Sequence, residues 1–103
     1  MSSDSLYAEV FVEFLHAEAG GRSRPVKLDE SYRPHFRVGE GELLGVAFVD
    51  GPDEPVAPGS SSFATVRFLY APAVHYDALK LGTCFSVVEG SQSVGAGRVT
   101  RRS

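Results

Sequence analysis

The feature that most constrains the fold is a strict alternation of side chains near the start of the chain, in residues 6–15. Every second residue there is apolar, while the intervening positions carry a mixture of acidic, aromatic and aliphatic side chains. A period of two places the apolar set on one face of an extended strand, and β-branched and aromatic residues favour that conformation. In a helix the same apolar residues would scatter around the axis. The pattern therefore predicts a β-strand with one face toward a core.

Five further segments resemble strands and are separated by turn residues. Clusters of glycine and proline at residues 20–25 and 50–60, and the proline at position 72, interrupt regular structure between these segments. We expect the further strands in residues 33–38, 43–49, 63–71, 83–89 and 93–100. Only residues 73–81 are compatible with a helical turn. Six short strands predict an all-β domain, either a small barrel or a sandwich, and closure into a barrel removes exposed strand edges.

Length and composition limit the classes of protein to which the chain belongs. With 103 residues, of which 43% are hydrophobic, the chain suffices for one domain with a modest core. We expect a disordered N-terminus at residues 1–5, the domain at residues 6–101 and a disordered tail at residues 102–103. The formal charge of −3 makes the chain a poor general binder of phosphate backbones.

The sequence indicates a soluble, cytoplasmic protein that does not enter a membrane. Its first residues carry neither a basic region nor an apolar run, so we expect no signal peptide. Apolar runs are short, whereas about 20 apolar residues are needed for a helix to span a bilayer. The single cysteine, Cys84, excludes an internal disulfide, which agrees with a reducing compartment.

The sequence gives little support for catalysis, for a metal site or for a cofactor. Cys84 is a conceivable nucleophile, but a lone cysteine on a strand is more often a small core residue. The three histidines lack metal-ligand spacing. The Gly95-x-Gly97 pair lacks the following helix of a dinucleotide site, so we expect these glycines to allow close backbone approach or bending. The phosphate-loop motif G-x-x-x-x-G-K-[ST] is absent, so we expect no GTP binding. With these candidates set aside, we expect no enzymatic activity and no cofactor.

Several short motifs follow one another in a distinctive order along nearly the whole chain. The strand at residues 8–12 leads into Gly20-Gly21-Arg22-x-x-Pro25 and then into Tyr32-Arg33-Pro34-x-Phe36. Near the end, Phe85-x-Val87-x-Glu89-Gly90 is followed by Val94-Gly95-Ala96-Gly97. In this order the motifs resemble the C-terminal domain, domain 3, of translation elongation factor Tu.

The resemblance implies a closed, six-stranded antiparallel β-barrel without catalytic residues. In the family, this domain contacts the T stem of aminoacyl-tRNA, the GTPase domain and the nucleotide-exchange factor. Matching the motifs places tRNA-facing positions at His35 and, in the closing hairpin, at Val88, Glu89 and Gly90. The family carries arginines in that hairpin, and their loss weakens the case for tRNA binding because phosphates need cationic partners. The residues that replace them are Cys84, Val88 and Gln92.

Two candidate binding surfaces follow from the alternation. Arg33, His35 and Arg37 are predicted on the outward face of one strand, and the barrel resemblance places Arg22 near them. Such a face is suited to bind an acidic patch of a protein or the backbone of an RNA. The alternative is an ordinary strand face that contacts only solvent. Apolar residues at nominally outward positions, Phe11 and Leu69, indicate a second surface that a partner covers.

We expect a non-enzymatic binding module whose partner is a protein, either related to translation or a second copy of the chain. In the family, the GTPase domain covers one side of this barrel, so a free copy needs another cover. The alternative is an RNA-binding accessory protein that engages tRNA or ribosomal RNA through the basic strand face. The binding residues expected under these hypotheses are Arg22, Arg33, His35, Arg37, Glu89 and Gly90.

Overall fold

Six strands and one short 3-10 turn form the regular structure of residues 6–103, the part of the chain that this computed structural model describes. The elements are β1 (Tyr7–Phe14), η1 (Ala17–Ala19), β2 (His35–Arg37), β3 (Leu44–Asp50), β4 (Ser61–Phe68), β5 (Cys84–Glu89) and β6 (Gln92–Arg102). The disordered N-terminus predicted at residues 1–5 lies outside the described residues.

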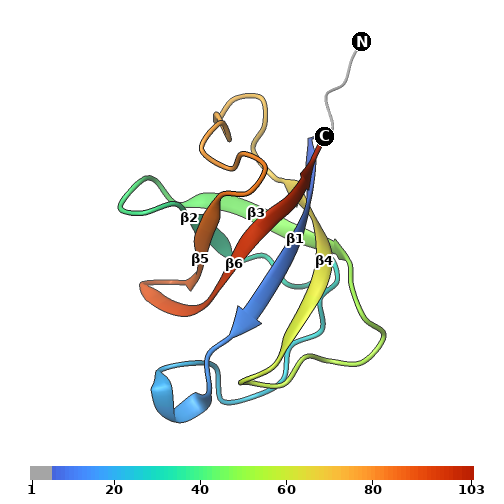
Figure 1. Cartoon of the computed structure of the whole chain (residues 1–103), viewed down its shortest axis with the longest axis vertical. Coiled ribbons are helices and arrows are strands. Elements are labelled where there is room, and N and C mark those ends of the chain that lie inside the picture. The colour runs from blue at the N-terminus through green and yellow to red at the C-terminus, as the bar shows by residue number, and fades with distance from the viewer. Residues whose placement is uncertain (1–5) are drawn as a thin grey trace.

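The strands close into a barrel in the order β1-β4-β3-β2-β5-β6, and every neighbouring pair is antiparallel. Figure 1 shows β6, β1 and β4 side by side in front, and we call these three strands the β6–β1–β4 wall. Closure gives each strand a partner on both sides and so removes free edges. The prediction of an all-β, closed, six-stranded antiparallel barrel is confirmed.

The core follows from the alternation that the sequence shows. In β1, Val10 and Val12 are fully buried while Glu9 and Glu13 are exposed, as predicted. Burial of each such aliphatic side chain stabilises the fold by roughly 1.5–3 kcal/mol. Aromatic rings fill the middle of the barrel, where Phe36 stacks on Phe85 with ring centroids 4.0 Å apart.

Two glycines in β6 allow the backbone of β1 to approach closely. A Cβ atom on Gly95 would lie 2.6 Å from the carbonyl oxygen of Glu13, and one on Gly97 would lie 2.5 Å from that of Phe11. Both distances are far below a normal carbon–oxygen contact, so neither position accepts a side chain without movement of the backbone. This agrees with the predicted role of the Gly95-x-Gly97 pair.

The structure differs from the prediction around the end of β4. The strand ends at Phe68 rather than at residue 71, and residues 73–81 form turns without a helix. Tyr70, just beyond the end of the strand, is 55% exposed, and its ring lies over Gly45. Tyr76 and Leu79 are nevertheless buried, so two residues of this irregular segment anchor it to the barrel.

Two further differences concern the lengths of the second and the last strand. The second strand spans only His35–Arg37, although the carbonyl of Pro34 still accepts a hydrogen bond of 3.1 Å from the amide of Val46. The last strand runs to Arg102, and the amide of Ser103 donates to the carbonyl of Tyr7 at 3.1 Å. Residues 102–103, predicted to be a disordered tail, are therefore joined to the barrel.

Candidate functional site

Three residues from distant parts of the chain meet in a hydrogen-bonded cluster, which we call the Tyr32 cluster: Arg22, Tyr32 and Glu89. The hydroxyl of Tyr32 donates to Oε2 of Glu89 at 2.6 Å, and Nη1 of Arg22 donates to the same oxygen. The guanidinium carbon of Arg22 also lies 5.4 Å from the centroid of the Tyr32 ring. The cluster brings together two of the predicted site residues, Arg22 and Glu89.

The hairpin between β5 and β6 holds Glu89 in this position. Glu89 pairs with Gln92 across a two-residue turn, and Gly90 occupies the first central position with a φ of +61°. A positive φ at that position suits the right-handed twist of the strands and favours glycine. The structure therefore gives Gly90 a conformational role in placing Glu89.

The electrostatics of the Tyr32 cluster are internally balanced. Burial raises the pKa of the Tyr32 hydroxyl, and its hydrogen bond to Glu89 raises it further, so the phenol remains a protonated donor. The carboxylate of Glu89 is neutralised by Arg22, and both side chains are about one-quarter to one-third exposed. Because Arg22 and Glu89 satisfy each other, the cluster joins three segments of the chain and offers no free charge to a ligand.

The basic stripe of Arg33, His35 and Arg37 has the outward orientation predicted from the sequence. These residues are exposed or half-buried and alternate with the buried Pro34 and Phe36. Only His35 and Arg37 belong to β2, and Arg33 lies just before it.

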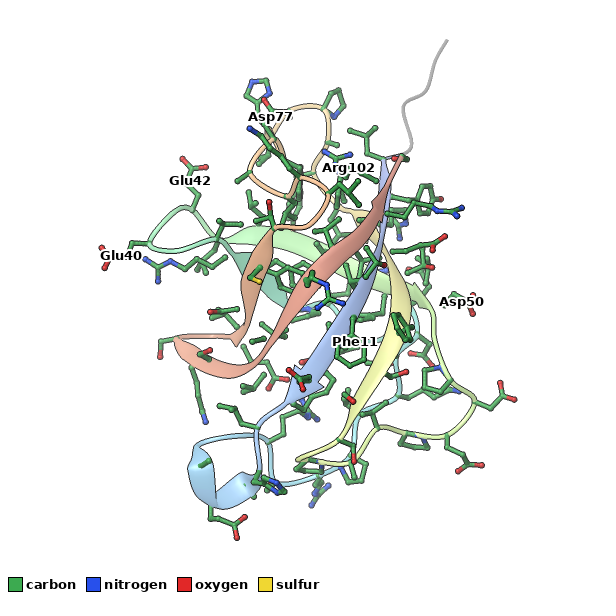
Figure 2. All side chains as sticks on the ribbon, viewed as in Figure 1. Phe11, Glu40, Glu42, Asp50, Asp77 and Arg102 are labelled. Atoms are coloured by element: carbon green, nitrogen blue, oxygen red, sulfur yellow. The ribbon has the colours of Figure 1, made fainter. Side chains whose placement is uncertain are left out.

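The two arginines of this stripe turn back onto their own chain. Nε of Arg33 donates to the carbonyl of Glu30 at 3.0 Å, and its Nη2 lies 3.5 Å from the Glu30 carboxylate. Nε of Arg37 donates to the carbonyl of Gly41 at 2.9 Å. Figure 2 shows the side chains of Glu40 and Glu42 on the loop that follows β2. The stripe is therefore mixed in charge and does not form a concentrated positive surface.

An aromatic pair stands on the outer face of the β6–β1–β4 wall. Phe11 of β1 lies directly opposite Phe63 of β4, and their ring centroids are 4.9 Å apart. Phe63 is 65% exposed. The guanidinium carbon of Arg98 in β6 lies 5.9 Å from the centroid of the Phe11 ring. Figure 2 labels Phe11 on this wall.

The sequence analysis placed Phe11 and Leu69 on one outward surface, but the residue beside Phe11 is Phe63. Leu69 lies six residues beyond Phe63, roughly 20 Å away at about 3.3 Å per residue, and so does not share a patch with Phe11. The alternation in β4 already placed Phe63 outward. Its position opposite Phe11 depends on the register of two strands that are distant in sequence.

Cys84 is exposed, which corrects its interpretation as a small core residue. It stands outward because Phe85 and Val87 take the inward positions of β5. His35 pairs with Val88, four residues from Cys84 and therefore roughly 13 Å along the strand, beyond the reach of a nucleophile and its base. This spacing gives no support to a Cys84–His35 catalytic pair.

Within residues 6–103, no group of three or more histidine, cysteine, aspartate or glutamate residues is arranged to hold a metal ion. In the same part of the chain, no helix is long and apolar enough to cross a membrane. No protein-family model matches the chain. The function must therefore be argued from the surfaces described above.

Proposed function

We propose that the chain is a non-enzymatic binding module whose partner is a protein, and that its barrel is related to domain 3 of elongation factor Tu. The observation that carries this proposal is the Phe11–Phe63 pair, in which Phe11 is half-buried and Phe63 is exposed. A ring that is 65% exposed in the free chain gains about 25 cal/mol per Å² of apolar surface when a partner covers it. Aromatic residues are correspondingly enriched at protein interfaces.

The resemblance to domain 3 and the observed fold give this proposal independent support. The closed barrel has the architecture that the resemblance to domain 3 implies. In that family the domain acts through contacts with other macromolecules and carries no catalytic residues. A barrel that works in this way acts through a partner, and a translation component is one candidate.

The contacts of the arginines favour a protein partner over RNA. Nε of Arg33 and Nε of Arg37 already donate to the carbonyls of Glu30 and Gly41. The carboxylate of Glu30 lies 3.5 Å from Arg33 and compensates part of its charge. Glu30 is further held by Arg67, whose Nη2 lies 2.8 Å from it. The basic stripe therefore offers a phosphate backbone less uncompensated positive charge than its residue types suggest.

The test compares three tagged baits in a cell extract: the wild-type chain, Phe63→Ser and Leu81→Ser. Leu81 is the matched control because it is 68% exposed, like Phe63, but lies in the loop before β5. We expect wild type and Leu81→Ser to retain the same protein, and Phe63→Ser to retain about tenfold less of it. Treatment with ribonuclease leaves this pattern unchanged.

Two results contradict the proposal. Equal recovery of every protein by the wild type and Phe63→Ser removes the aromatic pair as the binding surface. Recovery of tRNA that washes off with salt, without a protein that depends on Phe63, assigns the module to RNA.

A further inference from the structure

The surroundings of Phe63 are acidic on one side. A hollow of about 320 Å³ lies beside its ring, and within residues 6–103 the charged residues that line it are Glu9 of β1 and Asp50 of β3. Both residues pair with Thr65, one from each neighbouring strand, and Thr65 is two residues from Phe63 in β4. The register therefore places one carboxylate on each side of the strand that carries the exposed ring.

Further acidic residues lie in the loop that follows Asp50. Asp53 and Glu54 follow Asp50 in the loop between β3 and β4, and both are exposed. Figure 2 shows Asp50 at the edge of the wall, beyond β4. On the other side, Nη1 of Arg101 lies 3.9 Å from Oε2 of Glu9, but both side chains are more than half exposed. Such a pair is weak in water, so Glu9 is free to accept another cation.

Phe11 already shows how this wall receives a cation. The guanidinium of Arg98 lies over the Phe11 ring, which is the geometry of a cation–π contact. Phe63 is the other ring of the pair and faces the hollow with Glu9 and Asp50. No basic side chain of residues 6–103 lines that hollow.

We propose that Phe63, Glu9 and Asp50 form a docking site for a basic side chain, an arginine or a lysine, of a partner protein. The inference rests on the proposed function and adds the chemistry of the partner. The cation lies against the exposed ring and between the two carboxylates, so both attractions act on the same group. The same carboxylates repel phosphates, which excludes a nucleic-acid backbone from this site.

The test is a titration of the ¹⁵N-labelled protein with blocked pentapeptides, followed by the amide chemical shifts. The probe is acetyl-Gly-Arg-Gly-Arg-Gly-amide, and the matched peptides carry lysine, glutamine or glutamate in place of arginine. We expect saturable shifts at Phe63, Thr65 and Asp50 with the arginine and lysine peptides, weakened by added salt. The glutamine and glutamate peptides leave these amides unshifted.

Substitutions of the three proposed residues test whether the peptide binds at this site. Phe63→Leu keeps an apolar side chain but removes the ring, and we expect roughly threefold to fivefold weaker binding of the arginine peptide. The double variant Glu9→Gln, Asp50→Asn is expected to lose saturation. The matched control neutralises two other exposed acids, Glu40→Gln and Glu42→Gln, and leaves the affinity unchanged.

Three outcomes overturn the inference. The first is the absence of saturable shifts at these amides at millimolar peptide. The second is binding that the Glu9 and Asp50 substitutions do not change. The third is a shift of the same amides when the protein is concentrated without peptide, which assigns the surface to a second copy.

The extract experiment separates this inference from the proposed function. A protein retained through Phe63 but unaffected by the Glu9 and Asp50 substitutions leaves the proposed function standing and removes the basic partner. Shifts with the arginine peptide, without any protein retained through Phe63, support the cation site and remove the proposed function.

Discussion

The hydroxyl of Tyr32 donates a hydrogen bond of 2.6 Å to Oε2 of Glu89, although the two residues stand 57 positions apart in the chain. Tyr32 lies three residues before β2, near the end of the long connection from η1, whereas Glu89 ends β5. Arg22 joins the same carboxylate from the start of that connection. The Tyr32 cluster therefore holds both ends of this connection, which contains neither a helix nor a strand, against the end of β5.

The first prediction concerns the contribution of the Tyr32–Glu89 hydrogen bond to the free energy of unfolding. Tyr32→Phe removes the hydroxyl from a residue that is only 8% exposed and leaves the ring in place. We expect a loss of about 1 kcal/mol in the free energy of unfolding, since the acceptor is partly solvated and keeps its bond from Arg22. Urea denaturation measures it. The control is Tyr70→Phe, at a residue that is 55% exposed, and equal losses in the two variants would contradict the assignment.

The second prediction concerns alkaline pH. Burial raises the pKa of Tyr32 above its ordinary value of 10.0, and the bond to Glu89 raises it further. The folded chain thus keeps a proton that the unfolded chain loses, so this stabilisation is complete below about pH 10 and declines above it. Each such tyrosine contributes a slope of up to about 1.4 kcal/mol per pH unit.

Burial raises the pKa of Tyr76 as well, so the wild type carries contributions from more than one tyrosine. We expect the unfolding free energy of Tyr32→Phe to fall less steeply with pH than that of the wild type, in urea titrations above about pH 10. Parallel pH curves for the two proteins would show that Tyr32 does not contribute.

The third prediction concerns the contact between β1 and β6. In Gly97→Ala the new Cβ atom would lie 2.5 Å from the carbonyl oxygen of Phe11 and 2.7 Å from Cζ of Phe85. Neither group moves easily, because one is backbone and the other is stacked on Phe36. We expect a loss of about 2–3 kcal/mol from overpacking.

Thermal unfolding measures this loss, and a change of that size lowers the midpoint by roughly 10 °C or more in a domain of this length. The control is Ala96→Ser, an exposed position between the two glycines of β6, where we expect a change within about 0.5 kcal/mol. Equal thermal midpoints for Gly97→Ala and the control would mean that β1 and β6 move apart without a loss of stability.

Local patterns in the sequence were sufficient to predict six strands of an all-β domain, whereas the closed barrel was implied by the resemblance to domain 3. The inward residues of β1 and the outward stripe around His35 follow from alternation alone, since neighbouring side chains of a strand point to opposite faces. The turn at Gly90 follows from the conformational freedom of glycine.

Contacts between distant segments were not predictable in the same way. The pairing of Phe11 with Phe63 depends on the register between β1 and β4. The back-folding of Arg37 onto Gly41 depends on the path of a loop, which alternation does not encode.

The last prediction concerns the end of β6, where the sequence indicated a disordered tail. Nε of Arg102 donates to the carbonyl of Leu79 at 2.7 Å, and its Nη2 donates to that of Tyr76 at 3.3 Å. Its guanidinium carbon also lies 4.6 Å from the centroid of the Phe68 ring. Figure 2 shows Arg102 beside the loop that carries Asp77. Arg102 thus ties the irregular segment between β4 and β5 to the barrel.

Arg102→Met keeps an apolar stem but removes both hydrogen bonds and the cation over Phe68. We expect a loss of about 1–2 kcal/mol and faster amide hydrogen exchange at residues 76–83, measured by exchange under native conditions. The matched control is Arg101→Met, since the Arg101 side chain is 76% exposed and its ion pair with Glu9 is 3.9 Å long. A disordered tail would make the two substitutions equally harmless, whereas a structural role for Arg102 requires that only its own removal loosens the loop.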